Sequence, residues 1–416
     1  MSNSLIKTER FSLAKSLHLP ELSARNFFFK TLEKFEHGQI QIIEGQESFS
    51  FGHAEDNKVH AQIYIHDTKT YSSILIGGSI GMAEAYMQGY WTTDNLAAVI
   101  QFFSRNLSIA EKLEGPLSKI GQALFKLRYA FERNSISGSK KNIVAHYDLG
   151  NDFFKLFLDD TMMYSMAIFQ DKAKNDLHQA QLHKLKTICD KLELSQDDHL
   201  LEIGTGWGGL AAYAAENYGC KVTTTTISEE QYAYAKEQIQ SKNLEDKVTL
   251  LKKDYRLLEG SFDKMVSIEM IEAVGHQYFD QYFETCSHLL KPDGLFLMQV
   301  ITIPDQRFHR AIKEVDFIKR YIFPGCCIPS IQALSTSAMK KSSFRIINLQ
   351  DYAEDYADTL KAWNLKFQNN KEQALKLTDE TFFRMWEMYL AYCEGGFRER
   401  IIGCSQILFA KEENRS

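Results

Sequence analysis

HLLEIGTGWGGLAAYAAENYG, residues 199–219, decides the fold of this chain. A short apolar run ends in a cluster of glycines, and the residues that follow favour a helix that closes at Gly219. The pattern predicts a buried strand that turns sharply into a helix. Because Gly204 and Gly206 lack a β-carbon, a ligand can approach the backbone of this turn closely. We therefore expect a nucleoside-type cofactor here rather than a turn that is merely tight.

The same alternation of strand and helix continues downstream. Expected strands follow at 221–228, 247–254, 262–270 and 294–303, and expected helices at 229–243 and 279–290. Such an order predicts an α/β fold with a mostly parallel sheet and helices on both faces. Right-handed crossovers then place the carboxyl ends of the strands, and the ligand crevice, along one edge of the sheet.

The residues leave two cofactor classes open, a dinucleotide and S-adenosylmethionine. A dinucleotide site usually has an acidic residue at the end of the second strand to hold the ribose. Here KVTTTTIS, residues 221–228, ends in hydroxyls instead. Asp254 follows the third strand, where its carboxylate can accept a hydrogen bond from an adenine amino group. Both details favour S-adenosylmethionine.

The N-terminal part of the chain has a different pattern. Apolar residues alternate at Ile40 and Ile42 and again from Val59 to Ile65, as in half-buried antiparallel strands, and 79–104 favours helix. We expect an accessory α+β domain over 1–130, a polar linker over 131–141 and a catalytic domain over 142–416. Residues 117–141 carry six basic side chains against one acid and describe a basic amphipathic helix that can lie on anionic lipid or pack on a core.

Composition excludes several classes of protein. With 44% hydrophobic and 25% charged residues the chain is globular, and its formal charge of −6 gives no general field for binding nucleic acid. Seven scattered cysteines indicate reduced thiols, and no run of about 18 apolar residues predicts a membrane span. No metal-binding pattern is present. We expect a cytoplasmic protein.

Several segments in order resemble one known family. They are NIVAHYDLGNDFFKLFLDDTMMYS (142–165), LLEIGTGWGG (200–209), TISEEQ (226–231), VSIEMIEAVG (266–275), IFPG (322–325) and CEGGFRERIIGCSQ (393–406). This combination, which spans about 142–410, is similar to the cyclopropane-fatty-acyl-phospholipid synthases, a family that includes mycolic acid methyltransferases and some alkaloid N-methyltransferases. The resemblance implies a class I methyltransferase (Rossmann-like) fold with a seven-stranded sheet, helical lid insertions and S-adenosylmethionine as cofactor.

The resemblance also implies where the cofactor binds. Tyr164 and Ser165 would line its site, and the turn at Gly204 and Gly206 would hold its methionine part. The ribose and nearby groups would be held by residues of the TISEEQ segment, namely Thr226, Ser228 and Gln231.

The resemblance further implies a reaction at a cis double bond of a phospholipid acyl chain. The alkene attacks the sulfonium methyl, and a base then removes a proton from the resulting carbocation so that a cyclopropane ring closes. In the family the base is thought to be bicarbonate, and the positions that match its anchors are Met166, Glu272, Gln299, Ile301 and Tyr356. Gln299 keeps a donor for an anion, whereas the thioether of Met166 has none.

Two questions stay open at this level. Glu272 can itself accept a proton, since burial raises the pKa of a carboxylate. Loss of a proton elsewhere on the cation would give a methyl-branched or methylene lipid, and an amine is a further candidate substrate. The expected partner is an unsaturated phospholipid, met by peripheral contact at the inner face of the membrane, with no nucleic acid and with a possible homodimer by analogy.

Overall fold

A computed structural model of the protein describes residues 19–53, 59–112, 149–171 and 176–415. The chain forms two compact units, Met1–Phe125 with Thr378–Glu399, and Lys126–Leu377 with Arg400–Ser416. The expected linker and basic helix lie outside the described residues, so the boundary near residue 130 stays a prediction. The sequence did not indicate that the segment 378–399 groups with the N-terminal unit.

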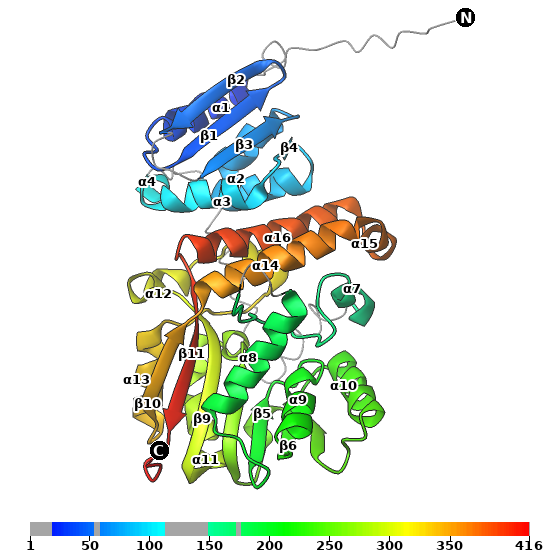
Figure 1. Cartoon of the computed structure of the whole chain (residues 1–416). Helices are drawn as coiled ribbons and strands as arrows, with labels where there is room; N and C mark the ends of the chain where they lie inside the picture. The colour runs from blue at the N-terminus through cyan, green and yellow to red at the C-terminus, as the bar shows by residue number, and fades with distance from the viewer. Residues whose placement is uncertain (1–18, 54–58, 113–148, 172–175, 416) are drawn as a thin grey trace, which may run out of the picture. The chain divides into compact units, whose positions relative to one another are not determined.

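The first unit is a small α+β structure, as expected. Its elements are α1 Leu19–Leu32, β1 Gln39–Glu44, β2 Glu47–Gly52, β3 His60–Ile65, α2 Lys69–Met87, β4 Trp91–Thr92, α3 Leu96–Arg105, α4 Leu107–Lys112 and α16 Glu380–Arg398. The sheet has the order β2-β1-β3-β4 (Figure 1). The alternating apolar residues Ile40, Ile42, Ile63 and Ile65 are buried. The expectation that these strands run antiparallel is wrong for β1 and β3, which pair in parallel, whereas β1 and β2 form an antiparallel hairpin.

The long helix α16 belongs to this unit through specific contacts. Gln101 Nε2 and Arg105 Nε on α3 donate to the carboxylate of Glu399, each over 2.8 Å. At Gly395 a β-carbon would come within 2.7 Å of the Ile100 side chain, so α16 and α3 lie closer together than other residues would allow.

The second unit has the predicted seven-stranded sheet. Its strands are β5 His199–Ile203, β6 Lys221–Thr226, β7 Val248–Lys252, β8 Phe262–Ile268, β9 Leu290–Thr302, β10 Arg345–Asp351 and β11 Gly403–Ala410. They lie in the order β10-β11-β9-β8-β5-β6-β7. Strands β5 to β9 pair in parallel, and β11 runs antiparallel to both β9 and β10. This is the sheet of the class I methyltransferase fold that the sequence analysis expected.

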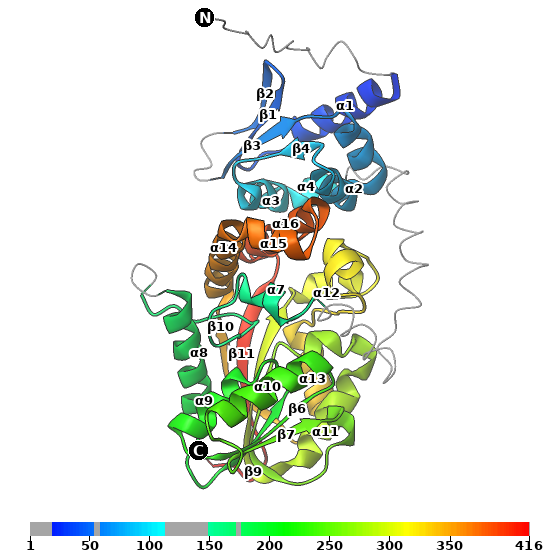
Figure 2. The same ribbon diagram turned by 90° about the vertical axis from the view of Figure 1, so that its right-hand side faces the viewer.

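Helices cover both faces of this sheet (Figures 1 and 2). The helical elements are α7 Asn151–Lys155, α8 Leu177–Lys191, α9 Gly209–Asn217, α10 Glu229–Ser241, η2 Tyr255–Leu257, η3 Ile271–Ala273, η4 His276–Tyr278, α11 Phe279–Leu289, α12 Asp305–Ala311, η5 Ile318–Ile322, α13 Ile331–Lys341, α14 Ala353–Asn369 and α15 Lys371–Leu377. The helices that follow β9 and β10, among them α12, η5 and α14, are additions to the alternating strands and helices.

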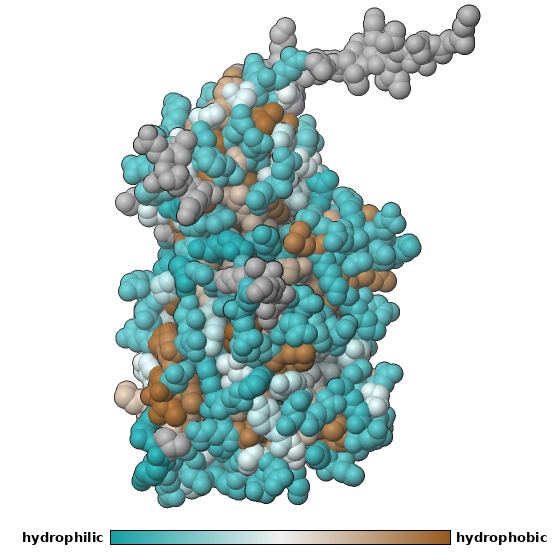
Figure 3. Space-filling view, in the orientation of Figure 1, coloured by the Kyte–Doolittle hydropathy of each residue, from teal (hydrophilic) through white to brown (hydrophobic). Residues whose placement is uncertain are grey.

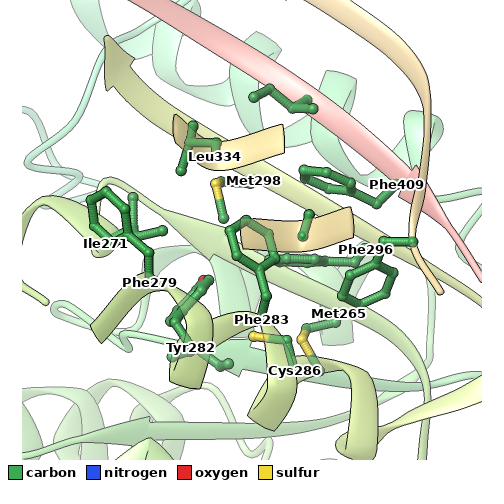
Figure 4. Close-up of a cluster of buried hydrophobic side chains, with 14 of the residues drawn as sticks. Met265, Ile271, Phe279, Tyr282, Phe283, Cys286, Phe296, Met298, Leu334 and Phe409 are labelled. Atoms are coloured by element: carbon green, nitrogen blue, oxygen red, sulfur yellow. The ribbon is translucent and has the colours of Figure 1, made fainter. Parts of the chain in front are cut away.

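The two faces follow from the alternation of side chains along the strands. Met265 and Phe296 pack with Phe283 of α11 in one core, whereas their neighbours Val266 and Leu297 pack against α8 and α9 in the other. Figure 4 shows the first core, where aromatic and sulfur side chains from the strands and α11 fill the layer. Near-continuous apolar strands are typical of a sheet buried on both faces.

This arrangement fixes the location of the site. The parallel strands β5, β6, β8 and β9 all end at the same edge, so the segments that follow Ile203, Thr226 and Ile268 are neighbours. The predicted ligand crevice belongs to this edge.

An apolar patch lies on the surface of the second unit at β10 and α13. Met339, Ile346, Ile347 and Leu349 are exposed there (Figure 3). Met339 and Ile346 also line a surface pocket of about 270 Å³. In the described ranges no helix is long and apolar enough to cross a bilayer. The same ranges contain no group of three or more His, Cys, Asp or Glu side chains arranged to hold a metal ion.

Candidate active site

The glycine turn after β5 leaves open space above its backbone. Gly204 has φ 100° and Gly206 has φ 54°, both in the left-handed region that favours glycine. The amides of Gly204 and Thr205 donate to Thr225 O over 3.2 and 3.0 Å, which fixes the turn against β6. A β-carbon at Gly206 would meet no heavy atom within 4 Å. The turn therefore offers the space for a bound ligand that the sequence predicts.

The three predicted residues of the TISEEQ segment come together at the end of β6. Thr226 Oγ1 donates to Gln231 Oε1 over 2.9 Å, and it accepts from the amide of Ser228 over 3.1 Å. Ser228 caps α10 by accepting from the Gln231 amide over 3.3 Å. All three side chains are buried, so the segment is a preformed polar surface beside the glycine turn.

Asp254 lies after β7, as predicted, but its carboxylate already has a partner. Arg256 donates to both of its oxygens, with Nε to Oδ1 over 2.9 Å and Nη2 to Oδ2 over 2.6 Å. The pair lowers the pKa of Asp254 against the effect of burial, so the carboxylate is charged. A contact of Asp254 with an adenine stays a prediction, and it would use the remaining lone pairs of these oxygens.

Tyr164 lies in a cluster of aromatic rings. Its ring centroid is 5.3 Å from that of Trp363 on α14 and 5.4 Å from that of Phe154 on α7. Phe154 in turn contacts Trp207 of the glycine turn at 4.8 Å, and Trp207 Nε1 donates to Asn151 Oδ1 over 2.7 Å. The cluster thus joins the segment 149–165 to the cofactor turn with faces that can stabilise a cation.

Ser165 is held by a buried lysine that the sequence analysis did not identify. Lys184 Nζ donates to Ser165 Oγ over 2.8 Å, and Lys184 is 0% exposed. Burial lowers the pKa of this amine to about 8, while the charge of Glu269 opposes the shift. At neutral pH a positive charge therefore lies in the interior beside the predicted cofactor residues.

Four of the five positions expected to cradle an anion donate to two buried carboxyl groups, those of Glu269 and of the fifth position, Glu272. Glu269 Oε1 accepts from the Met166 amide over 3.0 Å and from Gln299 Nε2 over 2.8 Å. Its Oε2 accepts from the Tyr356 hydroxyl over 2.6 Å. Burial raises the pKa of Glu269, and these three donors, together with the nearby Lys184, oppose the rise.

Gln299 has a fixed orientation in this cluster. Its Oε1 accepts from Gln406 Nε2 over 3.0 Å, and Gln406 Oε1 accepts from Lys191 Nζ over 2.9 Å. A lysine can only donate, so it must face the amide oxygen of Gln406. This sets which end of each amide is oxygen and which is nitrogen, and it directs Gln299 Nε2 toward Glu269.

Glu272 occupies the remaining anchor. Its Oε1 accepts from the Ile301 amide over 2.6 Å, whereas its Oε2 is buried and has no partner within the described part of the chain. Burial, reinforced by the negative charge of Glu269, raises the pKa of Glu272 to about 8. Glu272 is therefore protonated at neutral pH, and its neutral state explains how it lies close to a second carboxylate.

The residues present do not fit a bicarbonate ion. All five predicted anchors are brought together, but the donors of Met166, Gln299 and Tyr356 are directed at Glu269, and that of Ile301 at Glu272. An added anion would lie against the charged carboxylate of Glu269 and would lack these donors. The expectation of a bicarbonate site is not supported by this geometry.

Sequence reasoning missed Glu269 and Lys184. Glu269 is part of VSIEMIEAVG and ends the expected strand 262–270 at the crevice edge, so its position along the chain was a usable indication. Lys184 lies on α8, and a basic residue in a helix gives no sign of burial because most lysines are exposed.

Glu202 on β5 allows a test of whether burial raises the pKa of a carboxyl group in this region. It is 3% exposed, it accepts from Thr224 Oγ1 over 2.6 Å, and burial raises its pKa to about 8. The folded state therefore binds a proton more tightly than the unfolded state. This contribution to stability is complete below pH about 4.5 and is lost as the pH rises to about 8. A glutamine has no proton to lose in this range. We therefore expect the melting temperature of Glu202→Gln to exceed that of wild type by a few degrees at pH 8 and by much less at pH 5.

Thermal denaturation at the two pH values measures this difference. Glu230→Gln is a matched control, because Glu230 lies exposed on α10 and we expect no change in melting temperature there. An equal effect of Glu202→Gln at both pH values would contradict the burial argument.

Comparisons with known proteins agree with this geometry. The family model described as "Mycolic acid cyclopropane synthetase" matches residues 135–407. The cyclopropane-fatty-acyl-phospholipid synthase of Escherichia coli strain K12 is 36% identical over 86% of this chain and 90% of its own length. The tuberculostearic acid methyltransferase UfaA1 of Mycobacterium tuberculosis is 35% identical over 80% of this chain and 79% of its own length.

A solved structure shows a similar fold. The crystal structure of the mycolic acid cyclopropane synthase CmaA1, complexed with SAH and CTAB, has 32% sequence identity and a TM-score of 0.62. The match covers 65% of this chain and 98% of that chain.

Proposed function

Since the chain belongs to the mycolic acid cyclopropane synthetase family of S-adenosylmethionine-dependent lipid methyltransferases, we propose that it acts on the cis double bond of an unsaturated phospholipid acyl chain. The product that we propose is a cyclopropane fatty acyl chain. S-adenosylmethionine supplies the one-carbon unit as an electrophilic methyl group, with the glycine turn, the TISEEQ segment, Tyr164 and Ser165 as its binding surface.

One observation supports a reaction through a carbocation. The consecutive residues Tyr164, Ser165 and Met166 join an aromatic cluster to a pair of buried carboxylates. Both features suit the addition of a methyl group to an alkene, since a cation forms on the acyl chain and then loses a proton. Aromatic faces stabilise the cation, and a site closed to water prevents its capture.

A second product has support from the comparisons. The relative from M. tuberculosis is named a tuberculostearic acid methyltransferase, and it is as similar to this chain as the E. coli synthase is. Loss of a proton from a chain carbon of the same cation would give a methyl-branched alkene, whereas a hydride shift to the cationic carbon, followed by loss of a proton from the transferred methyl group, would give an exocyclic methylene. All of these products share the methyl transfer that forms the cation.

Lipid analysis after expression in a host without such an enzyme tests the proposal. We expect unsaturated phospholipids to gain one CH₂ unit and to lose their olefinic proton signals, with new upfield signals of cyclopropane protons. Signals of an exocyclic methylene or a methyl branch, in place of the cyclopropane signals, would show that the enzyme makes the second product. An unchanged lipid profile with purified, cofactor-binding enzyme would refute lipid modification, and a methylated amine would assign the alternative substrate class.

The lipid is proposed to be reached by peripheral contact with a bilayer. The exposed residues Met339, Ile346 and Leu349 show that apolar surface is available on the catalytic unit. The location at the inner face of a cytoplasmic membrane and a homodimer remain parts of this proposal.

A further inference from the structure

We propose that the carboxylate of Glu269 is the proton acceptor of the reaction, a base built into the chain at the place where the resemblance implies a bound bicarbonate ion. This inference rests on the proposed function, because it names the group that completes the reaction. It replaces Glu272, which the sequence analysis favoured as the alternative base.

The hydrogen-bond donors around the Glu269 carboxylate are arranged as they would be around a planar anion. A main-chain amide, a side-chain amide and a phenol converge on the two oxygens of Glu269 over 2.6 to 3.0 Å. Three donors on one carboxylate are the partners that a small oxyanion would need. Because they come from separate parts of the chain, at Met166, Gln299 and Tyr356, the structure holds the carboxylate in one position.

The backbone at Glu269 supports a functional role. Glu269 has φ 49°, in the left-handed region that residues other than glycine rarely adopt, and its amide donates to Gln299 O over 2.7 Å. A glutamate retained in such a conformation, directly after β8, directs its side chain into the cluster at an energetic cost. Strain of this kind is typical of functional sites.

The surrounding charges place the negative charge on Glu269 rather than on Glu272. The titratable groups that interact with Glu269 are Lys184 on α8, Tyr356 on α14, Glu272 on η3 and Cys404 on β11. Glu269 has three donors, and Lys184 favours its charged form, whereas Glu272 has one donor. The hydrogen bonds therefore favour the charged form at Glu269 and the neutral form at Glu272. Its raised pKa makes Glu269 a stronger base than an exposed glutamate.

The proposed step balances in atoms and electrons. The alkene π electrons form a bond to the sulfonium methyl carbon, and the bond from sulfur to that carbon breaks with its electrons on sulfur. The acyl chain then carries a carbocation. The Glu269 carboxylate takes a proton from the transferred methyl group, and the electrons of that C–H bond close the ring. Glu269 ends protonated, and it returns the proton to solvent before the next turnover.

Glu269→Gly and Glu269→Gln give the test in buffers with and without carbon dioxide and bicarbonate. We expect wild-type turnover to be the same in both. Glu269→Gly removes the carboxylate and leaves its space and donors, so turnover should fall on the order of a hundredfold or more without bicarbonate and recover in part with millimolar bicarbonate. Glu269→Gln should fall by a similar factor without recovery, because the amide fills the space.

Two further readouts separate a lost base from a lost fold or a wrong substrate. Calorimetry should show that both variants bind S-adenosylmethionine like wild type, and that bicarbonate binds to Glu269→Gly but not to wild type. A wild type that requires bicarbonate, or a Glu269→Gly enzyme that is fully active without it, would overturn the role of Glu269. The same assay measures the lipid product of the wild type, so failure of the proposed function is seen separately. In that case the wild type would be inactive on the lipid, while bicarbonate would still bind to Glu269→Gly and not to wild type.

Discussion

Gly206→Val is expected to abolish measurable binding of S-adenosylmethionine and, with it, all transfer activity. The residue has φ 54°, and its missing side chain leaves open space within 4 Å. A valine would direct two methyl groups into that space, where the ligand must approach the backbone. The expected loss of affinity is on the order of a hundredfold or more, since a group that occupies the ligand position leaves no alternative pose. Calorimetric titration with the cofactor measures it directly.

The effect of backbone strain at a positive φ must be separated from the effect of a side chain that blocks the ligand. Gly219→Val is the matched control, because Gly219 has φ 73° and lies in the turn between α9 and β6 at the opposite edge of the sheet. Both variants should lose about 1–2 kcal/mol of stability from the left-handed backbone. Only Gly206→Val should lose the cofactor. Normal affinity in Gly206→Val would show that the ligand does not lie over this turn.

The five parallel strands of the catalytic unit could be predicted because each signal is local, whereas no pattern located β10 and β11. Short apolar runs such as HLLEI alternate with helical segments, and parallel pairing with crossovers follows from that order. Pairing in the N-terminal unit could not be predicted in the same way. The residues of β1 and β3 alternate regardless of strand direction, so the pattern at Ile40 and Ile63 does not distinguish parallel from antiparallel pairing. Nor does an amphipathic helix such as α16 reveal which unit it packs against.

The candidate site was predictable in its positions but not in its chemistry. The resemblance located the anchors at Met166, Gln299 and Tyr356, and the structure brings these residues together. Which group they surround depends on the backbone at Glu269, whose left-handed φ leaves no pattern in the sequence. Met166 shows the same limit. Its thioether lacks a donor, but its main-chain amide supplies one, and main-chain donors are present at every residue except proline.

Lys184→Met is expected to lower turnover at pH values on the acid limb roughly 10- to 100-fold, while it leaves the protein at least as stable at pH 7. The buried amine is a cation near Glu269, and it donates to Ser165 Oγ over 2.8 Å. Without it, the charged form of Glu269 loses the positive charge that favours it, so the pKa of that carboxyl rises further. The acid limb of the pH–rate profile should therefore move up by about 1–2 pH units. Steady-state kinetics over a range of pH measures both changes.

The stability of Lys184→Met should rise, whereas its turnover falls. Because burial lowers the pKa of Lys184 from 10.5 to about 8, the folded state holds its proton less tightly than the unfolded state. Wild type is therefore penalised below pH 8 by up to about 3 kcal/mol and recovers stability between pH 8 and 10.5, and methionine removes this dependence. Lys186→Met removes an exposed lysine of the same helix that pairs with Asp190, and it should change neither turnover nor the recovery of stability between pH 8 and 10.5. A Lys184→Met enzyme with wild-type turnover and an unmoved acid limb would show that the charge of Glu269 does not depend on this lysine. A loss of turnover with lower stability at every pH would indicate a packing role instead. The pairing of lower activity with higher stability is what distinguishes a charge retained for chemistry from one retained for the fold.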